Sequence, residues 1–299
     1  MPGDPKQHHY LPQFYLKGFC RDGKHFWVFD CKREKLRPRT TPFNTAKQSH
    51  YYSFTDPDGY RSTAIETYLS RLESAAGPHL ETLRRRGPLS PAALSELALF
   101  LAFLHTRGPS FERFTQQLYD STTKAFMQLI SRQPGAIERM LAETGDDVTL
   151  APEIRRSFEN KEGQYEIGSR ERLFLMLELG LGDLPKVLDA SGWCVLHAPA
   201  DAAFVTSDRP FTEIPPPATP GKPRPALLSP EGMKFIPLAL DMALTIHGEP
   251  RLAHVDARPD EVSKFNRLIA LQAEELIIGP DEGLVGDLAR TSRRTQTLA

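Results

Sequence analysis

The sequence predicts an α+β fold in which β regions near both ends of the chain form an antiparallel or mixed sheet packed against a central helical bundle. Short runs of aromatic and β-branched residues occur towards the two ends, whereas apolar residues recur every three or four positions between them. Strands and helices do not alternate along the chain as a parallel βαβ fold requires. We expect one domain over residues 1–290, with a β region at 8–60, a helical middle at 61–185, a β-rich part at 190–290 and a frayed tail at 291–299.

The N-terminal β region is predicted to contain a hairpin. The run Phe26-Trp27-Val28-Phe29 follows the turn signal Asp22-Gly23, and a polar turn at 32–35 leads to a second short run. Residues 40–60 are rich in Thr, Pro, Asn, Ser and Tyr, which is typical of an ordered loop.

The helical middle shows clear apolar periodicity. A first helix is expected from Ser62 to about Arg86, with a break at Gly77-Pro78. A second should begin at Ser90-Pro91, where Ser caps the helix and Pro occupies its first turn. It is apolar almost all round near its end, as in a helix at the centre of a core. Further helices are expected at 111–131, 136–143 and 170–181.

The C-terminal part returns to strand character. The runs at 193–197 and 203–206 suggest a hairpin joined through Pro199-Ala200-Asp201. Residues 215–230 are rich in Pro and Gly and predict a surface loop. Other expected elements are strands at 234–238, 243–246 and 275–278 and a helix at 260–273.

Composition indicates an ordinary globular protein. The 299 residues are 40% hydrophobic and 25% charged. No run of about 18 uncharged apolar residues occurs and the first residues lack the apolar core of a signal peptide, so a cytoplasmic protein without a membrane partner is expected. The three cysteines have no C-x-x-C spacing, which argues against a disulfide framework and a thiolate zinc site.

The net charge of −1 gives no support to strong nonspecific nucleic-acid binding. Residues 17–39 are nevertheless rich in Lys and Arg, with only Asp22, Asp30 and Glu34 as acids. This local bias fits either a solvated hairpin surface or a surface for an anionic substrate.

The most informative motif is His8-His9, which is followed by Tyr10-Leu11, by Pro12 and by an aromatic run ending at Phe19. Imidazole titrates near neutral pH and binds metal ions, so the pair is chemically capable. In a strand the two side chains point to opposite faces, so they cannot both bind one metal ion without a loop. Structural, catalytic and metal-binding roles remain open.

Several segments together resemble a bacterial family named domain of unknown function 4238. The matching segments are 8–19 (HHYLPQFYLKGF), 26–30, 42–44, 51–54, Ile65-Glu66, a helix ending near Arg107, 204–210 (FVTSDRP) and 235–238. The resemblance covers most of the chain. It implies no activity and no catalytic residues, because the family has no agreed function.

Three other positions are candidates for chemistry. Asp208 follows an apolar strand, where it could serve as a metal ligand, as a base or as a group that orients a histidine; the alternative is that it closes a turn. Ser207 is a weaker candidate for a nucleophile, because the Gly-x-Ser-x-Gly elbow is missing. Arg107 offers donors to a phosphate, or caps its helix. Glu66 shares a helix face with Glu73, and the two could contribute to a metal site; the alternative is that they are ordinary solvent-exposed glutamates.

The leading hypothesis is a hydrolase that cleaves phosphodiesters. Its specific form is a nuclease in bacterial conflict or phage defence, and the role in conflict or defence rests on the character of such families. No phosphate loop, Rossmann fingerprint or His-Glu-x-x-His motif occurs. In this scheme His9 is the base, Asp208 orients it, and Arg107 with Lys17 stabilises phosphate charge. A divalent metal ion would be held by His8, His9, Asp208 and Glu66. The alternative is a noncatalytic module that binds a protein or a nucleic acid through the N-terminal aromatic and basic surface; neither hypothesis fixes the oligomeric state.

Overall fold

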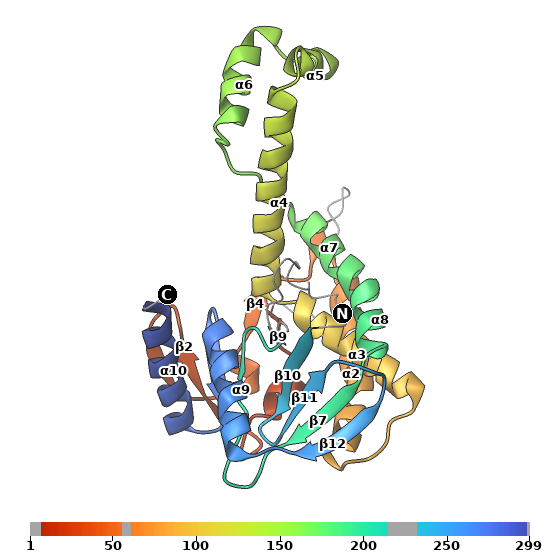
Figure 1. Ribbon diagram of the computed structural model, residues 1–299, viewed down its shortest axis with the longest axis vertical. Helices are drawn as coiled ribbons and strands as arrows, with labels where there is room; N and C mark the ends of the chain where they lie inside the picture. Colours follow the sequence, from red (N-terminus) through yellow and green to blue (C-terminus); the bar gives the residue numbers. More distant parts are fainter. Residues whose placement is uncertain (1–6, 56–60, 215–231, 298–299) are drawn as a thin grey trace. The chain divides into compact units, whose positions relative to one another are not determined.

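The computed structural model describes residues 7–55, 61–214 and 232–297 (Figure 1). The chain divides into two compact units. We call Met1–Ser110 with Leu173–Ala299 the sheet unit, and Phe111–Arg172 the helical unit. The proline-rich loop predicted at 215–230 lies outside the described residues.

Two larger sheets form the frame of the sheet unit, and the α+β class is confirmed. The four-stranded sheet has the order β3-β2-β13-β8, with bounds Lys35–Thr40, Phe26–Asp30, Leu276–Gly279 and Thr206–Ser207. The five-stranded sheet has the order β12-β7-β11-β10-β9, with bounds Leu252–Asp256, Trp193–His197, Met242–Ile246, Met233–Ala239 and Thr212–Ile214. The two ends of the chain therefore meet, because N-terminal β2 pairs with C-terminal β13.

The predicted hairpin of β2 and β3 is confirmed, and the strands expected at 234–238 and 243–246 are present and form a second hairpin. β2 pairs with β3, and β10 pairs with β11, each antiparallel. β12 lies parallel to β7, which makes the five-stranded sheet mixed. The strands carry buried apolar residues at successive positions, as in Ile277 and Ile278, because helices cover them.

The hairpin expected from 193–206 is wrong, since β7 and β8 belong to different sheets. The reason is a side chain far along the chain. The Asn266 Oδ1 accepts a hydrogen bond from the Val205 N–H at 3.0 Å, and its Nδ2 donates to the Ala203 carbonyl at 2.8 Å. The backbone that would continue the hairpin is thereby satisfied by a helix instead of by β7.

Short elements occupy the described part of the segment expected to be a loop at 40–60. A two-stranded sheet joins β1 (Gln7–His9) to β4 (Lys47–Ser49), and η1 covers Pro42–Asn44. β5 (Phe54–Thr55) pairs with β6 (Arg61–Ser62). The helix α1 (Gln13–Lys17) follows β1.

Four helices complete the first part of the sheet unit: α2 (Ala64–Arg84), α3 (Pro91–Thr106), α7 (Ser169–Leu181, from Leu173 in this unit) and α8 (Asp183–Asp189). The predicted cap of α3 is confirmed, because the Ser90 Oγ accepts the Ala93 N–H at 3.2 Å. The expected break at Gly77-Pro78 is wrong, because α2 continues through both residues. Glycine has no Cβ for the following proline ring to meet, so helical backbone before Pro78 is sterically permitted.

Two helices, α9 (Pro259–Gln272) and α10 (Glu282–Thr297), contribute to a core shared with both sheets. Its buried members include Phe29, Phe204, Phe235, Val262, Ile269, Ile277, Val285 and Leu288. The tail expected to fray from residue 291 is helical as far as Thr297. Burial of Leu288, Ala289 and Ser292 anchors this last helix.

The helical unit consists of α4 (Pro109–Ser131, from Phe111 in this unit), α5 (Ala136–Thr144), η2 (Val148–Leu150) and α6 (Ala151–Glu159) (Figure 1). Its core is small, with Ile137, Leu141 and Ala151 buried. The segment after α6 runs back along α4. In the part of the chain that the structure describes, no helix combines the length and apolarity needed to cross a membrane.

Candidate functional site

The N-terminal motif, residues 8–19, is hydrogen-bonded to both of the larger sheets. The fully buried Tyr15 hydroxyl on α1 donates to the Pro237 carbonyl of β10 at 2.8 Å, and lies 2.7 Å from the Thr206 Oγ1 of β8. Both partners are distant in sequence and belong to different sheets. A short helix is thus held by tertiary hydrogen bonds in a buried environment, where leaving them unmade is costly.

Gly18 ends α1 at a place where a side chain has little room. A Cβ there would lie 3.1 Å from both the Ala239 Cβ and the Leu238 carbonyl oxygen. The Gly18 carbonyl accepts the Leu240 N–H at 2.8 Å. The glycine of the motif therefore allows α1 to approach β10 closely.

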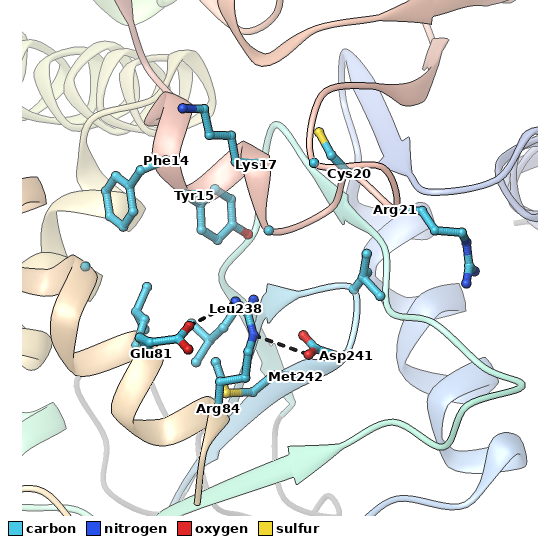
Figure 2. Close-up of a pocket in the computed structure, with 15 residues that line it drawn as sticks. Phe14, Tyr15, Lys17, Cys20, Arg21, Glu81, Arg84, Leu238, Asp241 and Met242 are labelled. Atoms are coloured by element: carbon cyan, nitrogen blue, oxygen red, sulfur yellow. Dashed lines mark hydrogen bonds and ion pairs between the residues drawn. The ribbon is translucent and has the colours of Figure 1, made fainter. Parts of the chain in front are cut away.

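A cavity of about 480 Å³ lies beside this junction (Figure 2). Its walls come from α1 and the turn after it, from α2, and from the end of β10 with the start of β11. The apolar part of the lining includes Phe14, Leu80, Leu238, Leu240 and Met242, and the charged part consists of Lys17, Arg21, Glu81, Arg84 and Asp241. The N-terminal motif therefore forms one wall of a ligand-sized cavity.

Three charged residues of the cavity lining, Glu81, Arg84 and Asp241, form a group of ion pairs. Arg84 pairs through Nη1 with the Glu81 Oε2 at 3.3 Å and through Nε with the Asp241 Oδ2 at 3.2 Å (Figure 2). Glu81 also pairs with the exposed Arg85. The Asp241 Oδ1 is buried and has no hydrogen-bond partner among the residues that the structure describes. Asp241 therefore has one oxygen paired with Arg84 and one buried oxygen acceptor that lacks a donor.

The remaining cations of the lining do not supply that donor. In Figure 2 the Lys17 and Arg21 side chains extend away from the group around Arg84. Arg21 pairs instead with Asp281 at 2.9 Å. Lys17, predicted to stabilise phosphate charge, is exposed and lines the cavity from α1.

Two groups in the lining that could act as nucleophiles are held in their protonated forms. Burial raises the pKa of the Cys20 thiol to about 11, and its Sγ lies 3.8 Å from the Leu16 carbonyl oxygen. Burial also raises the pKa of Tyr15, although its contact with Thr206 acts in the opposite direction. Neither side chain is therefore activated at neutral pH.

Arg107 is engaged by the protein through all three of its guanidinium nitrogens. Its Nη1 pairs with the Glu73 Oε1 at 2.6 Å, its Nη2 donates to the His9 carbonyl at 2.7 Å, and its Nε donates to the Tyr52 hydroxyl at 3.2 Å. Burial opposes the charge, but Tyr52 and Glu73 outweigh it and raise the pKa of Arg107. Arg107, at the end of α3, therefore connects α2 to the N-terminal motif through its ion pair and hydrogen bonds.

The two histidines point to different surroundings, as their adjacency in a strand predicts. His8 is fully buried, stacks on Tyr52 and accepts the Tyr52 N–H at its Nδ1 over 2.9 Å. His9 is half-buried, and its Nε2 lies 3.1 Å from the Phe43 carbonyl oxygen. Because a carbonyl only accepts, Nε2 carries the proton and Nδ1 is the basic atom of the neutral ring. Burial is the main cause that lowers the pKa of His9.

Glu66 joins the same neighbourhood. Burial raises its pKa, whereas the charge of Arg107 opposes that change. Its Oε2 is buried without a hydrogen-bond partner among the described residues. The structure thus brings His8, Arg107 and Glu66 around Tyr52, and His9 joins this group through its backbone carbonyl, which accepts from Arg107. Within the described ranges no three His, Cys, Asp or Glu side chains are arranged to hold a metal ion, so the metal role stays a prediction.

Asp208 lies in a separate hydrogen-bond network. Its buried Oδ1 accepts three backbone N–H groups, from Glu274 at 3.2 Å and from Glu275 and Leu276 at 2.9 Å each. Burial raises its pKa against the effect of these bonds. The local turn is closed by Ser207, whose Oγ accepts the Arg209 N–H at 3.0 Å. Asp208 and His9 share none of these partners.

The sequence does not single out the three charged residues that pair in the cavity lining, Glu81, Arg84 and Asp241. Arg84 and Glu81 lie on the exposed side of an amphipathic helix, where charged residues are ordinary. Asp241 lies in the turn between β10 and β11, where aspartate is common for conformational reasons. The one local signal was Gly77, a glycine inside α2 that lines the cavity.

Comparison with known proteins gives one match. The family model described as "Protein of unknown function (DUF4238)" matches residues 7–283. No curated protein and no solved structure matches the chain significantly.

Proposed function

The chain belongs to the DUF4238 family of proteins of unknown function, and from the cavity beside the N-terminal motif we propose that it is a noncatalytic binding protein for a small, partly apolar molecule that carries an amine. The observation that carries this proposal is Asp241, a residue of the cavity lining whose buried Oδ1 has no donor among the described residues. A buried acceptor without a partner is destabilising by about 1–3 kcal/mol, and a ligand N–H that reached Oδ1 as the Arg84–Asp241 ion pair rearranged would remove that penalty.

The rest of the cavity suits the body of such a ligand. Its volume of about 480 Å³ lies within the range of roughly 300–1,000 Å³ that is common for small-molecule sites. Phe14, Leu80 and Met242 provide apolar surface. The ion pairs of Arg84 are partly exposed, so they hold the carboxylates weakly and can rearrange around an ammonium group.

Binding has more support than hydrolysis. Cys20 and Tyr15 in the cavity are protonated, and Arg107 already makes bonds through every guanidinium nitrogen. The proposed phosphodiesterase would need Arg107 to exchange these partners for a phosphate. Hydrolysis by His9, Asp208, Arg107 and Lys17, and a role in phage defence, stay predictions.

Isothermal titration calorimetry with matched probes tests the binding function. We expect 2-phenylethylamine and tryptamine to bind and to raise the melting temperature, because a ligand of the native state stabilises it. The carboxylate 3-phenylpropionate, of similar size, should bind at least tenfold more weakly. Absence of binding by both amines at 1 mM, or equal binding of the carboxylate, would contradict the proposal.

Variants locate the binding to the cavity. Asp241→Ala should abolish amine binding, whereas Asp241→Asn keeps the oxygen acceptor and should retain part of it. Leu80→Trp should narrow the cavity, because the Leu80 side chain lines it. Leu94→Trp is the matched control, since Leu94 is half-buried like Leu80 and lies outside the cavity lining. Unchanged binding in both Asp241→Ala and Leu80→Trp would place the ligand elsewhere.

A further inference from the structure

The outward side of α4 in the helical unit is apolar, contrary to the usual pattern of a surface helix. Its exposed large apolar residues are Phe114, Leu118, Tyr119, Phe126 and Leu129, each between 45% and 60% exposed. At 100° per residue these five fall in one sector together with Ser121, Thr122 and Ala125. No charged residue of α4 between Phe114 and Leu129 falls in this sector, which we call the α4 apolar face.

The polar side of the same helix is the one that the protein covers. The Gln116 Nε2 donates to the Tyr165 carbonyl and its Oε1 accepts the Ile167 N–H at 2.8 Å. The Asp120 Oδ1 accepts the Tyr165 N–H at 3.0 Å, and Lys124 pairs with Asp120 at 2.8 Å. The returning segment thus packs on the hydrophilic side of α4 and leaves its hydrophobic side to solvent. Several large apolar groups side by side on a surface indicate an interaction site.

We propose that a second copy of this chain covers the α4 apolar face, through antiparallel pairing of the two α4 helices about a two-fold axis. The lack of charge on the face favours this occupant, because two identical faces then meet without like-charge repulsion, which a charged face would suffer. Antiparallel helices also align their dipoles favourably.

The spacing of large and small residues fits such a pairing. With the axis between residues 121 and 122, Phe114 of one copy meets Leu129 of the second copy, and Leu118 meets Ala125. Ser121 and Thr122 lie at the axis, where their small side chains permit close approach of the helices.

The size of the face is consistent with a reversible dimer. Aromatic side chains bury about 150–250 Å² when fully covered, so five half-exposed large residues offer roughly 500 Å² per copy. Their neighbours on the helix add to this area. A stable interface buries about 800 Å² per partner, so a weak, concentration-dependent association is expected.

Sedimentation velocity of the full chain from 1 to 100 μM tests the proposal. We expect a concentration-dependent dimer in the wild type, and at least a tenfold weaker association in Phe114→Glu and Leu118→Glu. Both residues are exposed in the structure, and unchanged circular dichroism will show that the variants fold. Phe174→Glu is the matched control, since Phe174 is 65% exposed and lies on α7.

A cysteine variant tests the orientation. Ser121→Cys should form an intermolecular disulfide under mild oxidation because residue 121 lies beside the axis, whereas the wild type, with its three native cysteines, serves as background. A monomer throughout the concentration range would overturn the proposal. So would equal dissociation by Phe174→Glu, or a monomer that binds phosphatidylcholine vesicles through Phe114, which would make lipid the occupant.

Discussion

At the residue scale, the side chains that attract most attention in the sequence hold the fold together. Arg107 joins the N-terminal motif to α2 and α3, and Asp208 holds the start of β13. A buried charge persists only when its partners are in place, so each of these residues is surrounded by groups that satisfy it. Their importance for stability is therefore testable apart from any activity.

Asp208→Ala should destabilise the protein by about 3 kcal/mol or more, because three buried N–H groups lose their acceptor. Asp208→Asn retains one side-chain oxygen and should cost clearly less. Urea unfolding followed by circular dichroism measures both, with the exposed Asp201→Ala as control. Equal losses in the Ala and Asn variants would show that the carboxylate charge matters and the shared acceptor does not.

His105 should make stability depend on pH. Burial, with a smaller effect of Arg209, lowers its pKa to about 4 from 6.5. The folded protein therefore resists protonation of this ring, and its stabilising effect is complete above about pH 6.5 and is lost as the pH falls towards 4. The loss amounts to about 3 kcal/mol. His105→Gln should show a flatter dependence of unfolding free energy between pH 7 and 4; a profile parallel to that of the wild type would refute the assignment.

At the element scale, the five-residue helix α1 owes its stability to its tertiary contacts. Isolated helices of this length do not form in water, so the hydrogen bonds of Tyr15 to β8 and β10 and the close approach at Gly18 hold it. The same contacts fix the wall of the cavity.

Tyr15→Phe should lower the unfolding free energy by about 1–3 kcal/mol, because the Pro237 carbonyl and the Thr206 hydroxyl lose a buried partner. It should also weaken amine binding through displacement of α1. The control is Tyr68→Phe, whose ring packs on Phe103 and whose removal of a hydroxyl should change stability little. A Tyr15→Phe protein as stable as the Tyr68→Phe protein would mean that packing of the ring suffices.

At the scale of the whole molecule, the two units have cores of very different size. The sheet unit has an extensive core that includes both larger sheets, whereas the helical unit buries Ile137, Leu141 and Ala151. A small core gives little resistance to local unfolding, so the helical unit should open without the sheet unit.

Ile137→Ala should remove about 2–4 kcal/mol from the helical unit, because Ile137 is completely buried in that core. Hydrogen exchange read by mass spectrometry should show lost protection within residues 111–172 and unchanged protection of β10 and β13. Ile269→Ala, in the core of the sheet unit, should give the opposite distribution. Loss of protection along the whole chain in Ile137→Ala would show that the units unfold together.

Sequence alone predicts the α+β class, the β2–β3 hairpin, the two strands that become β10 and β11, the Ser90 cap, the almost wholly apolar last part of α3 and the family. These features depend on neighbours within a few positions, because periodicity, turn residues and caps act locally. The split of His8 and His9 to different surroundings follows equally from the alternation of a strand.

Where those elements go and what their side chains contact depends on tertiary interactions. Asn266 satisfies the backbone at 203–205 from about sixty residues away and so assigns β7 and β8 to different sheets. Arg84 and Asp241, which are far apart in the sequence, form an ion pair in the lining of the cavity. The α4 apolar face is outward because a distant segment satisfies the polar side of that helix. Hydrogen bonds and burial between distant residues leave no pattern in a single sequence, and these are the interactions that create the candidate sites.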